Sequence, residues 1–370
     1  MATTIYPNLI LEALSKVRYP GTGKNLVEAG MVEDDIRIDG LRVSFSLVFD
    51  KPNSPFIKSV VRAAETAILT YVGEDVEIRG NISVKTPEIQ PKEAPKLLPE
   101  VKNVLAVFSG KGGVGKSTVS ANLAIALAQA GYKVGLLDAD IFGPSQPLMF
   151  GCEDARPVLE QVDDRELIQP IEKYGVKLLS IGFFVDKASP VLWRGSMASN
   201  ALKQLLSEGN WGELDYLLLD LPPGTSDIHL TLVQTLGITG ALVVTTPQQV
   251  ALSDAIKGIG MFLDDKIGVP ILGLVENMAW FTPAELPENK YYIFGKDGGR
   301  ALAEELDIPL LGQIPLVQSI CESSDEGAPS ATKEDSITAI FFRTLAKNVV
   351  EQVEKRNAEL APTQKVEVTK

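Results

Sequence analysis

The sequence predicts an α/β fold in which helices flank a mainly parallel sheet, with a small α/β domain before it. From Val101 onward, short apolar runs alternate with helical segments, as in parallel sheets that are buried on both faces. A glycine-rich loop at residues 110–117 joins one apolar run to an alanine-rich helix. Residues 1–86 combine amphipathic helical spacing with an alternating strand pattern, which indicates a separate, smaller unit.

The bulk composition indicates two domains and argues against some classes of partner. The chain has 370 residues, which is more than one ordinary domain. Its net charge of -13 argues against sequence-independent binding to nucleic acid or to anionic membranes. No apolar run approaches the length of a membrane span, and the N-terminus lacks the pattern of a secretory signal. We therefore expect a cytoplasmic protein with neither nucleic acid nor a membrane as partner.

Proline spacing and polar composition set the expected domain boundaries. Pro87, Pro91, Pro95 and Pro99 recur at every fourth position, which predicts a stiff linker. The expected parts are a small α/β domain (1–86), the linker (87–100), a larger α/β domain (101–356) and a polar, disordered tail (357–370).

Apolar periodicity predicts the individual elements. In the small domain we expect helices over 8–17 and 56–69, and strand regions over 41–49 and 76–84. In the larger domain we expect strands over 104–109, 134–138, 176–181, 214–220, 241–245 and 271–275, and helices over 120–130, 197–206, 250–263, 298–306 and 336–354.

The glycine-rich loop carries the strongest functional signal. Gly110-Lys-Gly-Gly-Val-Gly-Lys-Ser117 fits the pattern G-x-x-x-x-G-K-[ST] and lies between a strand and a helix, as a phosphate-binding loop requires. Backbone N–H groups and the positive end of the helix would hold the phosphates of a nucleotide. Lys116 would reach the β- and γ-phosphates, and the Ser117 hydroxyl would bind Mg²⁺. The expected nucleotide-binding residues of this loop are Gly110, Lys111, Gly112, Gly113, Val114, Gly115, Lys116, Ser117 and Thr118.

Carboxylates follow two of the expected strands. Asp220 ends an apolar run and is expected to anchor Mg²⁺, because nucleotides bind at the carboxyl ends of strands in open α/β sheets. The N–H of Gly224 could then contact the γ-phosphate. Asp138 and Asp140 follow another strand, and one of them could orient the attacking water, with Asp140 favoured. An aspartate that only caps a turn or faces solvent is the alternative.

These motifs resemble those of the MinD/ParA superfamily, in which a second lysine sits early in the phosphate loop, here Lys111. Within that superfamily, Asp138-Ala-Asp-Ile-Phe-Gly-Pro-Ser145, Asp220-Leu-Pro-Pro-Gly-Thr-Ser-Asp227 and Glu276-Asn-Met278 look like the Mrp (ApbC) type of iron–sulfur cluster carrier ATPase. Residues 10–85 resemble the small domain that often precedes such ATPases and also occurs alone in iron–sulfur assembly factors.

The resemblance implies a P-loop ATPase that uses ATP and Mg²⁺ and works as a homodimer in iron–sulfur cluster assembly or transfer. Its partners would be iron–sulfur apoproteins or assembly factors. Lys111 would reach the nucleotide of the partner subunit, so that slow hydrolysis is coupled to dimerisation. Lys111, Lys116 and Asp140 would be the catalytic residues. By resemblance, Asn277 would read the adenine edge with its amide.

The sequence departs from the family where cysteines are expected. The Mrp family usually carries Cys-x-x-Cys shortly after Glu-Asn-Met, where this chain has Trp280-Phe-Thr-Pro-Ala-Glu-Leu-Pro-Glu-Asn289. In the small domain, Asn53-Ser-Pro55 stands where a cysteine beside a proline is common. An iron–sulfur cluster ordinarily needs four thiolates, and this chain has two cysteines, Cys152 and Cys321.

Three interpretations of this departure stay open. Cys152 and Cys321 of two chains could together hold a cluster, although buried structural cysteine is the commoner role. The ATPase could instead dock its partners without binding a cluster durably. In the third interpretation, aromatic residues of the loop form a dimer or client contact; they are Trp280, Phe281, Tyr291, Tyr292 and Phe294.

Two other functions compete with cluster assembly. A positioning ATPase like MinD or ParA would need a membrane-binding C-terminal helix or a basic DNA-binding face, and the acidic charge and polar tail argue against both. A nucleotide-switched adaptor would bind client proteins and hydrolyse ATP too slowly to matter. His229, the only histidine, has no thiolate or triad partner in its motif and is expected to be structural.

Overall fold

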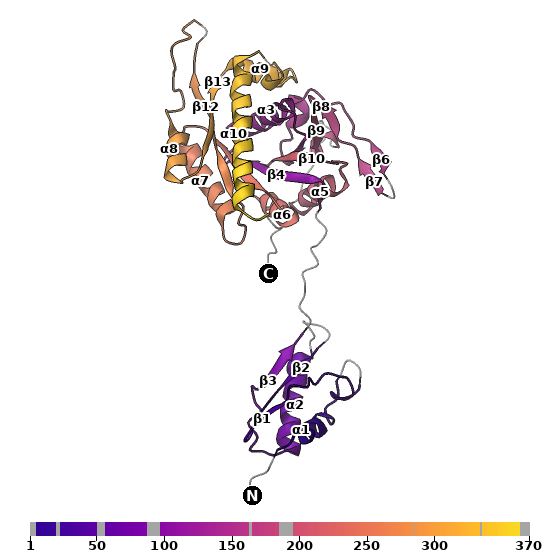
Figure 1. Ribbon diagram of the computed structural model, residues 1–370. Coiled ribbons are helices and arrows are strands. Elements are labelled where there is room, and N and C mark those ends of the chain that lie inside the picture. Colours follow the sequence, from indigo (N-terminus) through magenta and orange to yellow (C-terminus); the bar gives the residue numbers. More distant parts are fainter. Residues whose placement is uncertain are drawn as a thin grey trace. The chain divides into compact units, whose positions relative to one another are not determined.

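The chain consists of two compact units, Met1–Ala94 and Pro95–Lys370 (Figure 1). The computed structural model describes residues 5–19, 23–49, 56–86, 97–162, 165–184, 195–283, 285–333 and 335–362. The segment Asn53-Ser-Pro55, most of the expected linker (87–96) and the end of the expected tail (363–370) lie outside the described residues.

The N-terminal unit is a small three-stranded sheet with two helices. Its elements are α1 (Pro7–Leu14), β1 (Arg37–Asp39), β2 (Arg42–Val48), α2 (Ile57–Tyr71) and β3 (Ile82–Lys85). The strand β2 lies in the centre, antiparallel to β1 and parallel to β3. Buried side chains from both helices and from β2 form one core, which includes Ile10, Leu14, Phe45, Leu47 and Ile68.

The strand expected over 76–84 in this unit is shorter than predicted. Val76 and Ile78 are buried in the core and flank Glu77, which pairs with Arg42 of β2 only as an isolated bridge. Gly80 has a φ of +77°, in the left-handed region that favours glycine, and the strand begins only after it. The expected strand region is therefore divided into a single bridge at Glu77 and the strand β3, with a turn at Gly80 between them.

The C-terminal unit is built on an eight-stranded sheet with the order β13-β12-β11-β4-β10-β5-β9-β8. All neighbouring pairs are parallel except β8 and β9, which are antiparallel. The strands β6 and β7 pair with each other as a separate antiparallel hairpin (Figure 1). The strands are β4 (Val101–Phe108), β5 (Val134–Asp138), β6 (Leu159–Val162), β7 (Arg165–Ile168), β8 (Ile171–Lys173), β9 (Val176–Ser180), β10 (Leu214–Asp220), β11 (Gly240–Thr245), β12 (Ile271–Phe281) and β13 (Leu310–Leu316).

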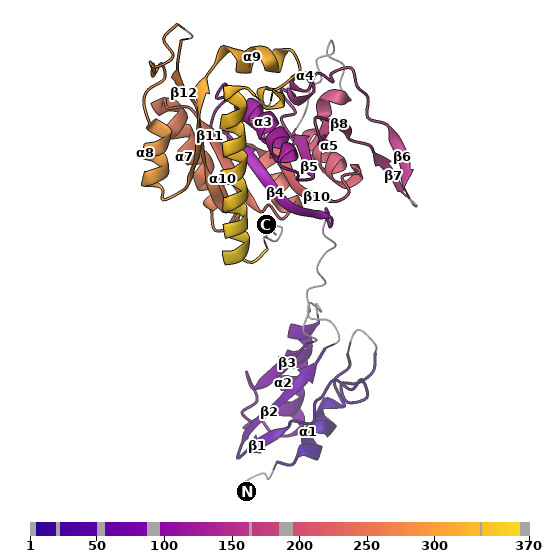
Figure 2. The same ribbon diagram turned by 45° about the horizontal axis from the view of Figure 1, so that its top comes forward.

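Helices cover both faces of this sheet (Figures 1 and 2). Along β4, Leu105 and Val107 join the core beneath α3 and α10, whereas Ala106 and Phe108 join the core beneath α5, α6, α7 and α8. Buried strand residues thus alternate between two cores, as a two-sided parallel sheet requires. The helices are α3 (Lys116–Gln129), α4 (Gln146–Met149), α5 (Gly195–Glu208), α6 (Asp227–Thr235), α7 (Gln249–Leu263), α8 (Gly298–Glu305), α9 (Gln318–Asp325) and α10 (Ile337–Glu359).

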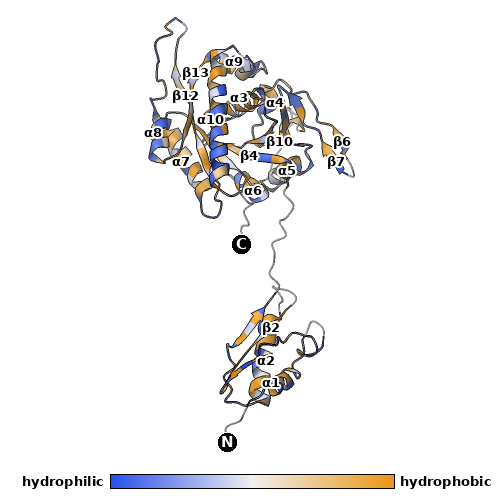
Figure 3. Cartoon of the chain, in the orientation of Figure 1, coloured by the Kyte–Doolittle hydropathy of each residue, from blue (hydrophilic) through white to orange (hydrophobic). Residues whose placement is uncertain are grey.

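The predicted fold class is confirmed, with differences at element ends. The final strand β13 and the short strands β6, β7 and β8 were not among the expected elements. The helix α10 carries both hydrophilic and hydrophobic residues (Figure 3) and continues to Glu359, so the expected tail is helical over its first three residues. Within the described part of the chain, no helix is both long and apolar enough to cross a membrane.

Candidate functional site

The glycine-rich loop connects the end of β4 to the start of α3, as predicted. Gly113 and Gly115 have φ values of +82° and +81°, which a residue with a Cβ rarely adopts. A Cβ on Gly110 would lie 2.1 Å from the backbone carbon of Asp254 in α7. The loop therefore needs glycine at these positions for two reasons, its backbone conformation and the close approach of α7.

A buried ion pair lies beneath this loop. The Nζ atom of Lys116 is 2.6 Å from Oδ1 of Asp220 and 3.1 Å from Oγ of Ser117. The Ser120 hydroxyl also donates to Asp220 Oδ1, over 2.9 Å. Lys116 is 6% exposed and Asp220 is fully buried, so each charge depends on the other for stabilisation. The structure thus brings together Lys116, Ser117 and Asp220, three residues that the sequence assigned to one site.

Gln146, at the start of α4, completes this cluster and was missed by the sequence analysis. Its Nε2 donates to Asp220 Oδ2 over 2.8 Å and to the carbonyl oxygen of Ser117 over 3.0 Å. Its backbone N–H donates to Asp138 Oδ2 over 3.1 Å. The only sequence signal was its place directly after the Asp138–Ser145 motif, where no functional pattern marks a glutamine.

The two aspartates after β5 have different surroundings. Asp138 is fully buried, and Ser180 Oγ donates to its Oδ2 over 3.0 Å. Burial, with a smaller contribution from the negative charge of Asp220, raises the pKa of Asp138 to about 7. Asp140 is only half-buried, and burial raises its pKa as well. Of the two, Asp140 is the carboxylate that solvent reaches.

The other predicted residues of the loop differ in their exposure to solvent. Lys111 is half-buried, and its ammonium group forms no ion pair with the described residues. The hydroxyl of Ser109 donates to the Lys111 carbonyl oxygen over 3.0 Å. Gly112 and Gly113 are exposed, whereas Val114 is buried and Thr118 is half-buried.

Two residues that were predicted to contact the nucleotide form hydrogen bonds with the loop or with the residue before it. The Gly224 N–H donates to the Ser109 carbonyl oxygen over 2.9 Å, so a contact with phosphate would require this bond to open. The Asn277 amide donates to the Val114 carbonyl oxygen over 2.8 Å, and Asn277 is 7% exposed. Both residues thus hold the loop in place, and their contacts with γ-phosphate and adenine stay predictions.

The residues at this site fit a magnesium ion. The predicted ligands, Ser117 Oγ and the Asp220 carboxylate, both lie within 3.1 Å of the Lys116 ammonium group, so they already share one cation. Both are oxygen ligands, which Mg²⁺ prefers. Gln146 Oε1 is in addition a buried acceptor without a hydrogen-bond donor among the described residues.

The two cysteines lie near the contact between α4 and α9. Cys152 is 9% exposed and lines a surface hollow of about 470 Å³ together with Asp325. The exposed Cys321 places its Sγ 3.8 Å from Asp325 Oδ2. Burial raises the pKa of the Cys152 thiol to about 11, which disfavours the thiolate that a metal requires. Across the described residues, no group of three or more histidines, cysteines or acids could hold a metal ion.

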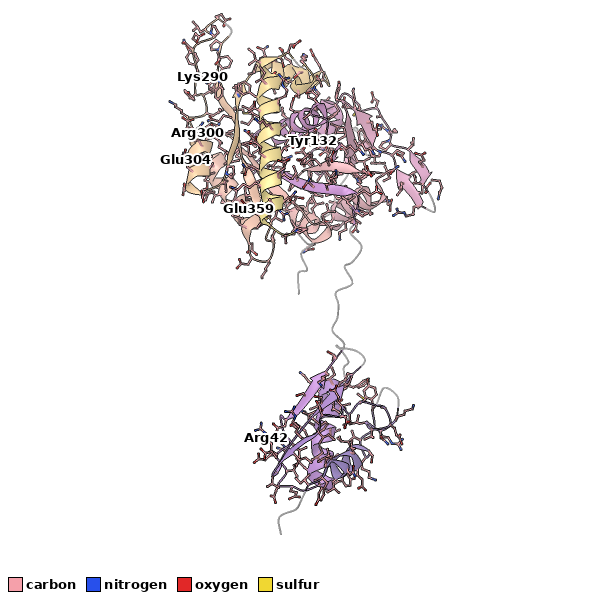
Figure 4. The ribbon with its side chains drawn as sticks, in the orientation of Figure 1. Arg42, Tyr132, Lys290, Arg300, Glu304 and Glu359 are labelled. Carbon is pink, nitrogen blue, oxygen red and sulfur yellow. The ribbon has the colours of Figure 1, made fainter. Side chains whose placement is uncertain are left out.

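The segment after Asn277 projects beyond the sheet, and Lys290 lies far out in it (Figure 4). Phe281 and Tyr291 exchange backbone hydrogen bonds of 2.8 Å, which join the two ends of the loop between them. Trp280 is half-buried, with its ring 6.0 Å from that of Phe341 in α10 and the Lys290 ammonium 4.0 Å above it. Of the five aromatic residues proposed as a contact surface, Tyr291 and Tyr292 are exposed, and Trp280, Phe281 and Phe294 are half-buried.

Protein families and curated relatives match most of the chain. Residues 100–350 match a family described as NUBPL iron-transfer P-loop NTPase, and residues 8–79 match one described as iron–sulfur cluster assembly protein. An iron–sulfur cluster carrier protein of Synechocystis sp. is 42% identical over 346 residues, which cover 93% of this chain and 97% of the relative. The iron–sulfur cluster transfer protein NUBPL of Dictyostelium discoideum is 38% identical, over 83% of this chain and 92% of the relative.

A solved structure shares both the fold and part of the sequence. A nucleotide-binding protein from Archaeoglobus fulgidus, in complex with ADP, is 36% identical and has a TM-score of 0.55. The match covers 66% of this chain and 92% of that chain. These matches confirm the resemblance to iron–sulfur carrier ATPases that the motifs predict. The chain belongs to the family of NUBPL iron-transfer P-loop NTPases.

Proposed function

We propose that this protein is a cytoplasmic, homodimeric P-loop ATPase that binds ATP with Mg²⁺ and acts in the assembly of iron–sulfur clusters or their transfer to apoproteins. One observation carries the nucleotide part of this proposal: Lys116, Ser117 and Asp220 meet in a buried cluster at the N-terminus of α3. The near-complete alignment with iron–sulfur cluster carrier proteins supports the cluster part and favours it over a positioning role.

The roles of the residues follow from their positions. The backbone N–H groups of the loop and Lys116 would bind the phosphates of ATP, and Ser117 and Asp220 would hold Mg²⁺. When bound, Mg²⁺ would neutralise charge on the β- and γ-phosphates. Asp140 would orient the attacking water, because it is accessible to solvent and its pKa is raised by burial.

Lys111 would act on the nucleotide of the partner subunit. Its ammonium is free of ion pairs with the described residues, and its side chain is half-buried. The Lys111→Ala variant should lose ATP-dependent dimerisation and most of its hydrolysis, while it binds one nucleotide per chain as before. Light scattering with ATP, together with nucleotide titration, measures both properties. Lys266→Ala, which removes an exposed lysine outside the loop, is the control. Unchanged turnover in Lys111→Ala would refute its proposed action on the partner's nucleotide.

A nucleotide-switched adaptor is the second candidate function. It is favoured by the sequence after Met278, where no cysteine stands in the place of the Cys-x-x-Cys of the Mrp family. Anaerobic reconstitution with iron and sulfide separates the two candidates, by measuring iron per dimer in the wild type and in a Cys152→Ala/Cys321→Ala variant. Iron that is bound by the wild type and lost in the variant supports a carrier. No stable iron in either protein supports the adaptor.

A further inference from the structure

Gln146 links three elements that meet beneath the phosphate loop. It is fully buried at the start of α4. Its Nε2 donates to the Ser117 carbonyl oxygen of α3 and to Oδ2 of Asp220 at the end of β10. Its backbone N–H donates to Asp138, at the end of β5. One side chain thus fixes the carboxylate of Asp220 relative to the residue that carries the predicted Mg²⁺-binding hydroxyl.

The orientation of the Gln146 amide follows from these partners. The Ser117 carbonyl and the Asp220 carboxylate can only accept, so the NH₂ group must face both of them. Both N–H groups are then used, and Oε1 points elsewhere. That oxygen is buried and has no donor among the described residues. A buried acceptor without a donor is unfavourable, and in native proteins it usually has an explanation.

The chemistry of the surrounding residues indicates which donor would suit Oε1. The amide contacts both residues that the proposed function assigns to Mg²⁺, Ser117 and Asp220. Mg²⁺ at nucleotide sites keeps several of its waters, and a metal-bound water is a strong hydrogen-bond donor. Groups that hydrogen-bond to a metal ligand and fix its orientation have a strong effect on metal affinity.

We propose that Gln146 is a positioning residue for Mg²⁺: its Nε2 fixes Asp220, and its Oε1 accepts a hydrogen bond from the water shell of the ion. This inference rests on the proposed function, because it assumes that nucleotide binds together with Mg²⁺. It assigns to Gln146 a role in metal affinity and none in binding the nucleotide itself.

The test compares ADP affinity with Mg²⁺ and with EDTA, by calorimetry, in the full-length protein. Gln146→Met keeps the side-chain length but removes both the donor and the acceptor. We expect the gain in ADP affinity from Mg²⁺ to fall by about 10-fold or more, as for other residues behind metal ligands. Metal-free ADP affinity should change much less than this, because the hydrogen bonds of Gln146 go to Asp138, Ser117 and Asp220 and to none of the loop glycines.

Gln313→Met is the matched control. The Gln313 amide also donates to a buried carboxylate, Glu276 Oε1, over 2.7 Å, but it belongs to β13. This variant should likewise lose a hydrogen bond to a buried carboxylate and keep the full effect of Mg²⁺. If Gln146→Met does not fold, Gln146→Asn replaces it, since its amide is too short to span Ser117 and Asp220 and should reduce the Mg²⁺ effect in the same direction.

The outcomes distinguish the inference from the proposed function. If Gln146→Met keeps the whole Mg²⁺-dependent gain, or loses metal-free affinity to the same extent, Gln146 has no positioning role and the inference is overturned. If wild-type protein gains no affinity from Mg²⁺, the proposed function is itself overturned, and the inference with it.

Discussion

At the scale of single residues, the cluster beneath the phosphate loop explains why charges can lie in the core of this fold. Lys116 and Asp220 are both buried, and burying either charge alone would be costly. Hydrogen bonds from Ser120 and Gln146 satisfy the remaining carboxylate positions of Asp220. Both oxygens of the Asp220 carboxylate thus accept hydrogen bonds, which hold the group in one place for the proposed metal ion.

The two cysteines should differ strongly in reactivity. Cys152 is buried, and the pKa of its thiol is raised to about 11, whereas Cys321 is exposed. Because the thiolate is the reactive form, iodoacetamide at pH 8 should modify Cys321 fully while Cys152 stays unmodified, with rates at least about 100-fold apart. Peptide mass spectrometry measures both sites, and urea-unfolded protein, in which both react, is the control. Equal rates in the folded protein would contradict the buried position of Cys152.

His229 should make stability depend on pH. It is 1% exposed, its Nδ1 accepts the Ser226 backbone N–H over 3.1 Å, and burial lowers its pKa to about 4. The unfolded chain, with a His pKa near 6.5, binds more protons between pH 6.5 and 4, so stability is lost as the pH falls through this window. The full contribution is about 3 kcal/mol.

Urea unfolding at pH 7 and at pH 5 measures this effect. Tryptophan fluorescence is a suitable probe, because all three tryptophans lie beyond residue 95 and report on the C-terminal unit. In His229→Gln the difference in unfolding free energy between the two pH values should shrink by about 2 kcal/mol. A difference of the same size in the variant and the wild type would show that His229 titrates normally.

The positions of single residues could be predicted where a sequence motif specifies both the backbone conformation and the charged side chains. The loop motif and the strand-end position of Asp220 were sufficient to predict that Lys116, Ser117 and Asp220 meet. Gln146 could not be predicted, because its role depends on three elements that converge only in the folded chain. The engagement of Asn277 with the Val114 carbonyl oxygen was missed for the same reason.

At the scale of elements, α7 packs against the start of the phosphate loop. A Cβ on Gly110 would lie 2.1 Å from the backbone carbon of Asp254 and 2.4 Å from the backbone nitrogen of Ala255. Backbone atoms inside a helix cannot give way as a side chain can. The closeness of β4 and α7 at this point thus depends on a residue without a side chain.

Gly110→Ala should therefore push α7 away from the loop and weaken nucleotide binding. Overpacking of this kind costs about 1–3 kcal/mol, which lowers the melting temperature by about 3–9 °C for a unit of this size. Differential scanning fluorimetry with and without ADP measures both effects. Gly112→Ala is the control for the packing effect, because the nearest atom to its Cβ is 3.9 Å away. Equal melting temperatures of the two variants would contradict the packing described.

The limits of a strand could be predicted from the sequence where nearly all of its residues are buried. Strands buried on both faces, such as β5 and β10, gave apolar runs with the correct limits. The strand β13 contains Gly312 and Gln313 and lies at the edge of the sheet, so its pattern was too mixed to recognise. The strand β12 extends beyond the predicted residue 275 because its polar residues Glu276 and Asn277 are buried with specific partners.

One strand, β12, connects the phosphate loop to the projecting segment. Glu276 accepts hydrogen bonds from the Gly299 N–H at the start of α8 and from Gln313. Asn277 binds the loop, and Met278, with a φ of +55°, marks an irregularity in the pairing with β13. Consecutive residues of one strand thus contact the nucleotide site and the helix that follows the projecting segment.

At the scale of the whole molecule, the candidate nucleotide site lies within one of two units. The N-terminal unit has its own core, and the loop, Asp220 and Gln146 all belong to Pro95–Lys370. Matches to two families follow the same division, with residues 8–79 matching an iron–sulfur assembly family and residues 100–350 matching the NTPase family. The nucleotide chemistry can therefore be assigned to the larger unit, and the proposed cluster function to the chain as a whole.

We propose that nucleotide chemistry at Lys116 drives cluster delivery. Its most direct test is the activation of an apoprotein that requires a [4Fe–4S] cluster, followed anaerobically with iron and sulfide, with and without ATP and Mg²⁺. We expect wild-type protein with ATP to accelerate activation, whereas Lys116→Ala, which loses the phosphate-binding charge, should not. Equal activation by wild type, by Lys116→Ala and by wild type without ATP would contradict it.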